Sequence, residues 1–393
     1  MPILAGAAAL AALAGGSATA GPSADPAPSC ILAFDGAEGA GACAAGGRGG
    51  RILEVTTLAD DGPGSLRVAV AANGPRTIQF NVAGTIRLAT DLVIRNGLLT
   101  IDGRSAPAGG IAIADHTLVV HADDVVIRYF RSRLGDQGGS VGDAIWISGG
   151  RRIILDHVSA SWSVDETLSA SSRYDESEGL YDVTVQWSII AESLRRAGHP
   201  KGDHGYGSLI RGGRGARFSF HHNVWANHVQ RMPRPGNYAP LSDDPIGPIM
   251  EYRSNVFYNW GGTASGYNAD TASGATYAFI DNCYIAGPDT KGRAIFREEN
   301  PNARSWFAGN SLDGVVATDQ RSLVNGLWNP LVATPDVALV RSDPRGCEAA
   351  LASAGASAPR DAVDARVISG IRTRTGRIID SQNDVGGWPD LSK

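Results

Sequence analysis

Short apolar segments return along most of this chain at a nearly constant interval. Aligned at one position of the repeat, their ends are Tyr129, His157, Trp187, Asn223, Asn255, Asn282 and Asn310. Successive members of this series are 27 to 36 residues apart. A strand-like unit that recurs every 20 to 50 residues or so predicts a solenoid or a propeller. This repeat restricts the possible folds more than any other feature of the sequence.

The turns between the segments separate these two architectures. A propeller blade joins four antiparallel strands by hairpins, for which Asn-Gly and Asp-Gly are the typical turn residues. Such pairs are sparse here, and variable stretches rich in Gly and Ser follow each segment. The sequence therefore predicts an all-β parallel β-helix, in which each coil adds a layer about 4.8 Å along the axis.

Four asparagines in succession occupy the aligned position: Asn223, Asn255, Asn282 and Asn310. In a β-helix, like residues of successive coils stack, and stacked side-chain amides can hydrogen-bond to one another and to the turn backbone. Each asparagine alone is an ordinary turn residue. Their recurrence in register predicts an asparagine ladder.

Composition agrees with one β-rich domain. The chain has 50 Gly, 20 Pro and three Met in 393 residues, which is unlike a helical protein. No polar linker interrupts the repeat, so residues 30–393 are expected to form a single domain and a monomer. A net charge of −5 gives no indication of nucleic-acid binding. A polyanionic ligand would need local basic residues or a bound metal.

The N-terminus has the pattern of an export signal. Residues 3–13 are apolar and small, and an Ala-Thr-Ala cleavage pattern ends at Ala20. We expect residues 1–20 to be a signal peptide and residues 21–29 to be a disordered leader. No stretch is long and apolar enough for a membrane span. The predicted location is outside the cell, or the periplasm if the source is a Gram-negative bacterium.

Four cysteines in an exported chain permit two disulfides with three possible connectivities. Their spacing matches no zinc site. Our hypothesis pairs Cys30 with Cys43 near the N-terminus and Cys283 with Cys347. The second bond would fasten the C-terminal tail to a coil.

Both ends of a solenoid need caps. Residues 63–71 begin with a helix-start signal and end before Asn73 and Gly74, which predicts a short helix over the first coil. Beyond about residue 340 the repeat fades. There we expect a second short helix at 347–354 and an irregular tail whose Trp388 packs along the outside.

Several segments resemble the polysaccharide lyase family 1 pectate lyases. Near the start these are the segments at 34–39, 46–50 and 62–67, with the letters FDGAEG, GGRGG and GPGSLR. Later ones are at 143–145, 155–166 and 229–234, with the letters DAI, LDHVSASWSVDE and VQRMPR. Their order and spacing match over most of the chain. The resemblance implies a right-handed parallel β-helix, calcium dependence and eliminative cleavage of polygalacturonate.

The resemblance also implies roles for particular residues. Asp143 matches a calcium ligand, Asp165 falls at a second acidic ligand, and Glu166 is expected to add another oxygen. Lys201 matches a lysine that binds a substrate carboxylate. Arg231 matches the arginine that takes the proton, and Arg234 matches one that helps to hold the substrate. The best-known members have a further arginine two positions on, where this chain has Gly236.

Elimination from a uronate removes the C5 proton next to a carboxylate. Calcium prefers six to eight oxygen ligands, and by bridging carboxylates it neutralises the charge that makes this proton poorly acidic. The lysine adds a point charge. Arginine is an unusual base because its pKa lies above 12. From residue type alone, Arg231 is more readily a carboxylate clamp than a base.

Other interpretations remain open at this level. Asp143 is equally suited to capping a turn, and the acidic pair at 165–166 to a solvated turn. His199 and His204 lie in the loop of Lys201 without an assigned role. A polygalacturonase would use clustered carboxylates without metal, but apart from Asp123 and Asp124 the sequence shows no such cluster. A metal-free pectin lyase and a carbohydrate-binding β-helix without catalysis are further alternatives.

Overall fold

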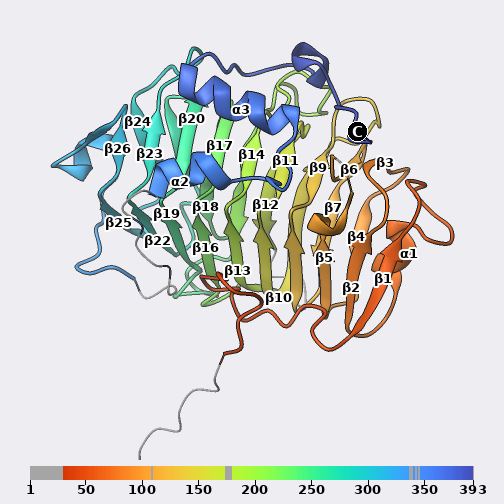
Figure 1. The fold of residues 1–393 in the computed structure, drawn as a ribbon. Helices are drawn as coiled ribbons and strands as arrows, with labels where there is room; N and C mark the ends of the chain where they lie inside the picture. The colour runs from red at the N-terminus through yellow and green to blue at the C-terminus, as the bar shows by residue number, and fades with distance from the viewer. Residues whose placement is uncertain are drawn as a thin grey trace, which may run out of the picture. The chain divides into compact units, whose positions relative to one another are not determined.

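The computed structural model describes residues 30–392 apart from 108, 173–178, 336–339, 341–342 and 344–345. The expected signal peptide and leader lie outside the described residues. Leu32–Lys393 form one compact unit, and Figure 1 shows its strands stacked coil upon coil. The predicted parallel β-helix is confirmed. None of the helices in the described part is long and apolar enough to cross a membrane.

Each complete coil contributes strands to three parallel sheets. The first sheet has ten strands on its main path. They are β1 (Arg51–Val55), β2 (Arg76–Phe80), β5 (Leu99–Asp102), β8 (Val125–Arg128), β10 (Ile145–Asp156), β13 (Leu180–Gln186), β16 (Arg217–His221), β19 (Ile249–Arg253), β22 (Ala275–Ile280) and β25 (Ala303–Ala308).

The second sheet follows the first after a two-residue turn in each of the central coils. It contains β3 (Gly84–Arg87), β6 (Ile111–Ala114), β9 (Arg131–Arg133), β11 (Ser159–Ser161), β14 (Ile189–Ala191), β17 (Val224–His228), β20 (Val256–Trp260), β23 (Cys283–Ile285) and β26 (Ser311–Leu312). The short β27 (Val315–Val316) closes it in antiparallel fashion.

The third sheet is reached from the second by connections of varied length, and it carries the predicted site. Its strands are β4 (Leu92–Ile94), β7 (Leu118–His121), the N-terminal half of β10, β12 (Leu168–Ser171), β15 (Leu209–Arg211) and β18 (Arg234–Gly236). A three-stranded sheet extends this side of the coil: β21 (Ala264–Asn268), β24 (Ala294–Glu298) and β28 (Val324–Gly326). Backbone hydrogen bonds from Met232 to Ser265 and from Tyr267 to Pro233 join the two groups.

Apolar side chains that point inward stack from coil to coil and form the core. One row runs through Phe220, Tyr252, Phe279 and Phe307, whose neighbouring ring centroids are 4.6 to 5.7 Å apart. These side chains are almost fully buried. Burial of apolar area stabilises by about 25 cal/mol per Å², so this continuous row contributes to every coil that it crosses.

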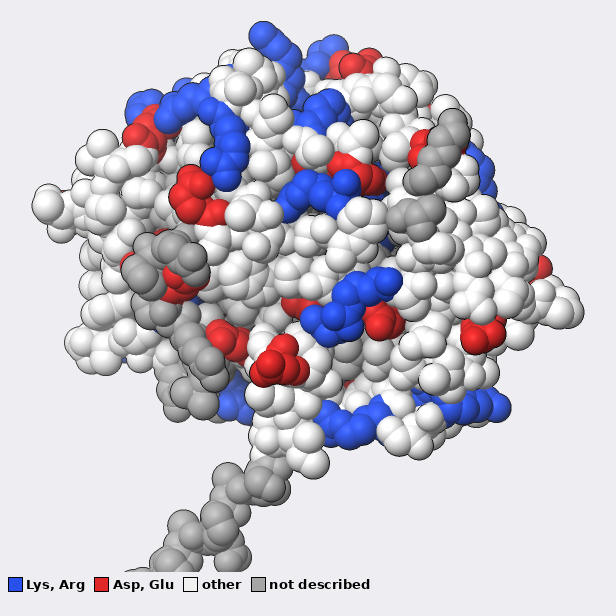
Figure 2. Space-filling view, viewed as in Figure 1, with Lys and Arg blue, Asp and Glu red and all other residues white. Residues whose placement is uncertain are grey.

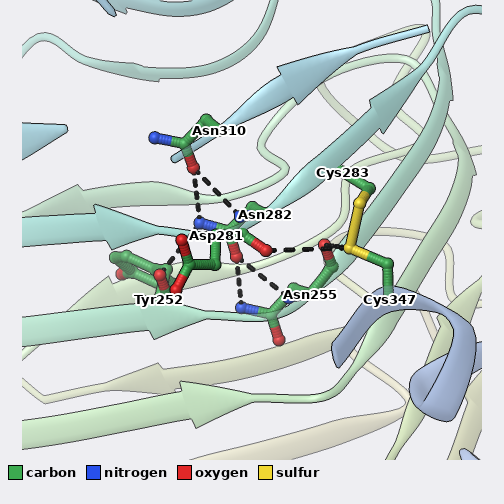
Figure 3. Close-up of a disulfide and its surroundings, with 7 residues drawn as sticks. All are labelled: Tyr252, Asn255, Asp281, Asn282, Cys283, Asn310 and Cys347. Atoms are coloured by element: carbon green, nitrogen blue, oxygen red, sulfur yellow. Dashed lines mark hydrogen bonds between the residues drawn. A yellow bond between two sulfur atoms is a disulfide. The ribbon is translucent and has the colours of Figure 1, made fainter. Parts of the chain in front are cut away.

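The asparagine ladder is confirmed at the turn between the first and second sheets. The side-chain oxygen of Asn255 accepts hydrogen bonds from the backbone and side-chain nitrogens of Asn223, at 2.9 and 3.2 Å. The same pattern links Asn255 to Asn282 and Asn282 to Asn310, as Figure 3 shows.

The predicted alignment is wrong by one residue at the start of this ladder. Gln186 pairs with His221, so Asn223 stacks on Ser188 and not on Trp187, and it accepts a hydrogen bond from the Ser188 backbone. Trp187 instead stacks on His222, with ring centroids 4.2 Å apart. Both residues have a left-handed backbone. The ladder residue is the next one along the chain.

The predicted caps are present. Helix α1 (Leu66–Ala71) begins at the N-cap Ser65 and buries Leu66 and Val70 against the first coil. Helix α2 (Gly346–Ser353) confirms the second short helix. Trp388 packs edge-on against Trp162 and donates a hydrogen bond to the Arg133 carbonyl. Three short 3₁₀ turns complete the described elements: η1 (Gly103–Ser105), η2 (Gln320–Leu323) and η3 (Gln382–Val385).

A third helix, α3 (Ala362–Thr373), was not expected in the tail. It lies beside α2 over the second sheet (Figure 1), where Val367 and Ile371 pack on Ile189 and Val224. Buried Arg133 of β9 bonds to Asp361, the N-cap of α3, and to Asp364 at 3.0 Å. Burial raises the pKa of Asp361, but Arg133 outweighs this effect and lowers it to about 2.

The disulfide Cys283–Cys347 is present and connects β23 to α2. It confirms this half of the cysteine hypothesis. No free cysteine occurs among the described residues, and the pairing of Cys30 with Cys43 stays a prediction.

Candidate active site

Three acidic residues converge where two strands of the third sheet begin. Asp143 precedes β10, and Asp165 and Glu166 precede β12. These strands are parallel neighbours in which Ile145 pairs with Leu168, so the residues ahead of them meet. The Glu166 backbone N–H donates to Asp143 Oδ1 at 3.3 Å. Oxygens of all three carboxylates lie within 4.8 Å of one another.

The electrostatics of this cluster favour a cation. Burial raises the pKa of Asp143 well above its usual range, and the nearby charge of Asp165 raises it further. A Ser169 hydrogen bond and the charge of Arg231 act in the opposite direction. Carboxylates that repel one another in this way offer the oxygen ligands that Ca²⁺ prefers. The donor set of the three predicted ligands therefore fits calcium.

Arg231 lies beside this cluster, in the connection between β17 and β18. Parallel bridges join Glu166 to Tyr206 and Tyr206 to Gln230, so three successive coils meet here. The Arg231 guanidinium forms an ion pair with Glu166 and lies 4.0 Å from the centre of the Tyr206 ring. Its Nε donates to the Tyr267 hydroxyl at 3.4 Å. The structure thus brings the predicted catalytic arginine to the predicted metal ligands.

Arg234 belongs to a second charged group one strand further on. Its Nη2 lies 3.0 Å from Asp270 Oδ1, and Arg211 of β15 pairs with the same carboxylate. Gly236 is register partner of Arg211. A Cβ at Gly236 would come within 1.9 Å of Asp270 Oδ2. A side chain at position 236 is therefore incompatible with this carboxylate as it stands.

Lys201 extends from an exposed loop next to the acidic cluster. Its backbone N–H donates to His199 Nδ1 at 3.2 Å. Burial lowers the pKa of His199, and the charges of His204 and Lys201 lower it further. Both imidazoles lie 3.7 Å from oxygens of Asp165. The Lys201 side chain is exposed, so of the six predicted site residues it is the one facing solvent most freely.

A groove of about 440 Å³ runs past the acidic cluster. Asp143, Asp165 and Glu166 line it together with Trp146 and Ser169. A larger hollow of about 620 Å³ lies at the turns between the third and first sheets, lined by Arg95, Arg151 and other residues. None of the predicted site residues lines that larger hollow.

Curated relatives identify the family. The chain is 34% identical over 383 residues to the probable pectate lyase C of Aspergillus flavus, an alignment that covers 93% of this chain and 83% of that protein. Its counterpart in Aspergillus terreus is 35% identical over 379 residues, with 92% and 83% covered. The chain belongs to the pectate lyase family. It is a polysaccharide lyase. No protein-family model matches it.

Solved structures share the fold of this lyase. A mutant pectate lyase of Bacillus subtilis superposes with a TM-score of 0.58 at 14% identity, covering 85% of this chain and all of that one. The cedar pollen allergen jun a 1 gives 0.55 at 16% identity, with 82% and 93% covered. A pectate lyase bound to a hexasaccharide also gives 0.55, at 15% identity, with 82% and 97% covered. At these identities the likeness shows the common β-helix.

Three residues that contact the predicted site of the lyase were not predicted from the sequence. Tyr206 lies under Arg231, Tyr267 accepts its hydrogen bond, and Asp270 holds Arg234. Aligning the third sheet, where Tyr206 stands one coil after Glu166, would have revealed the first of them.

Proposed function

We propose that this lyase cleaves de-esterified polygalacturonate by calcium-dependent β-elimination and releases 4,5-unsaturated oligogalacturonates. Asp143, Asp165 and Glu166 would hold the calcium, Arg231 would take the proton, and Lys201 and Arg234 would bind substrate carboxylates. The observation that carries this proposal is the convergence of the acidic cluster and Arg231 on three successive coils.

The chemistry follows from what a uronate requires. Bound calcium would neutralise the sugar carboxylate and make the adjacent C5 proton more acidic. Arg231 accepts that proton from C5 in its neutral form, after its own proton has passed to solvent. The electron pair of the C5–H bond forms the C4–C5 double bond, and the C4–O4 bond breaks, so that O4 leaves on the next sugar and takes up a proton from water. To reach the sugar, Arg231 exchanges its contact with Glu166 for one with the substrate.

The groove suits an extended polyanion for a further reason. Its charged lining is acidic, with Asp91 beside the acidic cluster, and Arg231 is ion-paired to Glu166, so a cation bound at the cluster would join these carboxylates to those of a uronate. By contrast, Figure 2 shows basic and acidic side chains interspersed over the described part of the face that bears α2 and α3. The hexasaccharide bound to a related fold agrees with a long ligand along the coil.

Export of the enzyme is part of the same proposal. The chain has the pattern of a cleavable leader in residues 1–20, and the disulfide Cys283–Cys347 is typical of proteins that mature in oxidising compartments. We expect cleavage after Ala20, which N-terminal sequencing of the secreted protein would test.

Ultraviolet absorbance of the unsaturated uronate tests the reaction. With polygalacturonate as substrate, absorbance should rise, stop on addition of a calcium chelator and resume when excess calcium is restored. Reducing ends that appear without this absorbance would indicate hydrolysis and contradict the proposal. An absorbance rise that survives chelation would contradict the calcium requirement alone.

A further inference from the structure

The loop that carries Lys201 brings two histidines to one acidic residue. His199 Nε2 lies 3.7 Å from Asp165 Oδ2, and His204 Nε2 lies 3.7 Å from Asp165 Oδ1. One ligand atom from each of the three residues falls within 4.8 Å of the others. The two imidazole rings stack with their centroids 3.6 Å apart. Nothing in the proposed elimination uses these histidines.

We propose that Asp165, His199 and His204 form a binding site for a divalent transition cation such as Zn²⁺, next to the acidic cluster with which it shares Asp165. Imidazole is a preferred ligand of Zn²⁺, Cu²⁺ and Ni²⁺, whereas Ca²⁺ selects oxygen. The two ligand groups that share Asp165 thus offer different chemistry. The carboxylate group suits a hard cation, and the group with two imidazoles suits a softer one.

The spacing is close to what such an ion needs. With bonds of about 2.0 to 2.1 Å, ligand atoms around a tetrahedral zinc are about 3.3 Å apart. The two separations between histidine and carboxylate, 3.7 Å each, exceed this by a few tenths of an ångström, and all three ligand atoms lie within 4.8 Å of one another. Both histidine side chains are 8% exposed, and that of Asp165 is 27% exposed. Asp165 therefore leaves an open path from solvent.

The loop backbone already orients His204 as a ligand. His204 Nδ1 lies 3.0 Å from the Gly202 carbonyl, which can only accept, so Nδ1 carries the proton and the lone pair of Nε2 faces Asp165. Metal-binding histidines are held in this way by a backbone carbonyl. A backbone hydrogen bond from His204 to the Arg195 carbonyl, at 2.8 Å, fixes this end of the loop.

His199 requires one rearrangement. Its Nδ1 accepts from the Lys201 N–H at 3.2 Å, so the neutral ring carries its proton on Nε2. Coordination through Nε2 moves this proton to Nδ1 and ends the contact with Lys201. Ion binding therefore shifts the Lys201 loop. Because Asp165 is shared, and if the proposed calcium site is right, the transition ion also competes with calcium.

Titration of the untagged, calcium-free protein with Zn²⁺ tests the site directly, by calorimetry at neutral pH. We expect one ion per chain. Loss of a ligand in His199→Gln or His204→Gln should weaken binding at least about tenfold, since even losses behind the ligands cost this much. His121→Gln, at the end of β7 and outside the loop, should leave binding unchanged. Equal affinity in the wild type and both loop variants would overturn the proposal.

A spectroscopic measurement on the wild type covers the case in which the variants do not fold. The electron paramagnetic resonance spectrum of bound Cu²⁺ should show coupling to two imidazole nitrogens, and a spectrum with oxygen ligands only would refute the site. Competition is measured separately, as inhibition of polygalacturonate cleavage by Zn²⁺ that excess calcium reverses. Zinc binding without inhibition would contradict the competition and leave the ion site standing.

Discussion

At the scale of single residues, the site is a set of charges that hold one another in place. Arg231 contacts a carboxylate, an aromatic face and a hydroxyl at once. Arg234 and Arg211 share Asp270. Each side chain is therefore positioned before substrate arrives, which lowers the entropy cost of binding in the reactive geometry.

Replacing Arg231 should reduce turnover and leave the fold unchanged. Loss of a positioned proton acceptor typically costs about 10² to 10⁴ in rate, so Arg231→Ala should lower kcat by at least about a hundredfold. The circular dichroism spectrum should not change, because the side chain lies at the groove and not in the core. Arg231→Lys keeps a charge but loses the planar fork, and we expect it to be nearly as inactive. A variant within a few-fold of the wild type would rule out the proposed role.

Glu298 makes stability depend on pH. This buried carboxylate accepts a hydrogen bond from Tyr277, and burial raises its pKa from 4.5 to about 8. Between these values the folded state binds a proton that the unfolded chain has lost. The free energy of unfolding therefore falls as pH rises from about 4.5 to 8, by roughly 2 to 5 kcal/mol.

In the variant Glu298→Gln this side chain cannot ionise, so the free energy of unfolding should not fall in this way as pH rises. Chemical denaturation at pH 5, 7 and 9 would measure it, with wild type and variant compared at each pH. Parallel pH profiles for the two proteins would show that Glu298 ionises normally.

At the scale of elements, the turns of the coil differ in whether their length is constant from coil to coil. The turn between the first and second sheets is two residues long in the central coils, with a left-handed residue followed by a ladder position. The connections to the third sheet vary in length and carry the loop of Lys201. The ladder fixes one corner, and the site uses another.

The central rung of the ladder should be costly to remove. In Asn255→Ala the carbonyl of Phe220 and the backbone N–H of Asn223 lose their partners. Buried groups left without a hydrogen bond cost about 1 to 3 kcal/mol each. We expect the free energy of unfolding to fall by about 2 to 4 kcal/mol, measured in urea.

The matched control is Asn325→Ala, an exposed asparagine of β28. Surface substitutions of this kind change stability by about 0.5 kcal/mol or less. Similar losses at both positions would mean that the ladder contributes no more than an ordinary asparagine.

The elements show why part of the fold was predictable. The coils follow from the apolar repeat, and the ladder from asparagines that recur at steps of 27 to 32 residues. The misalignment of Trp187 arose because residues at strand ends were matched by type. The residue with the left-handed backbone is the one before each asparagine, and Trp187 corresponds to that residue. Helix α3 was not predicted, because Val363, Val367 and Ile371 recur at helical spacing over only 12 residues, and so short an apolar pattern is a weak signal.

The candidate site also has residues that the sequence predicted and residues that it did not. Asp143, Asp165, Glu166 and Arg231 were expected together, and they meet because strands of successive coils are in register. Tyr206 and Asp270 come from connections whose lengths differ from coil to coil, and Tyr267 comes from β21. An alignment of the third sheet could find Tyr206, but the apolar repeat does not report where Tyr267 and Asp270 fold back.

At the scale of the whole molecule, a disulfide joins the tail to the coil. Cys283 and Cys347 are 64 residues apart in sequence. Helices α2 and α3, in the tail, pack on the second sheet. A bond that closes a loop of this length restricts the unfolded chain and stabilises by about 2 to 4 kcal/mol.

The double variant Cys283→Ser with Cys347→Ser should therefore unfold at a lower temperature. Its kcat on polygalacturonate should be retained at a temperature where it is folded, since the bond lies at the second sheet and the site at the third. Calorimetry measures the first effect and the absorbance assay the second. An unchanged Tm would mean that packing alone secures the tail.

The varied connections to the third sheet have a consequence for evolution and for design. Because the ladder holds one corner of the coils that it joins, insertions and exchanges in the connections to the third sheet leave that corner intact. Specificity for a new uronic acid polymer could then be acquired by grafting loops, one coil at a time. The β-helix is then a constant scaffold whose binding loops can be exchanged independently.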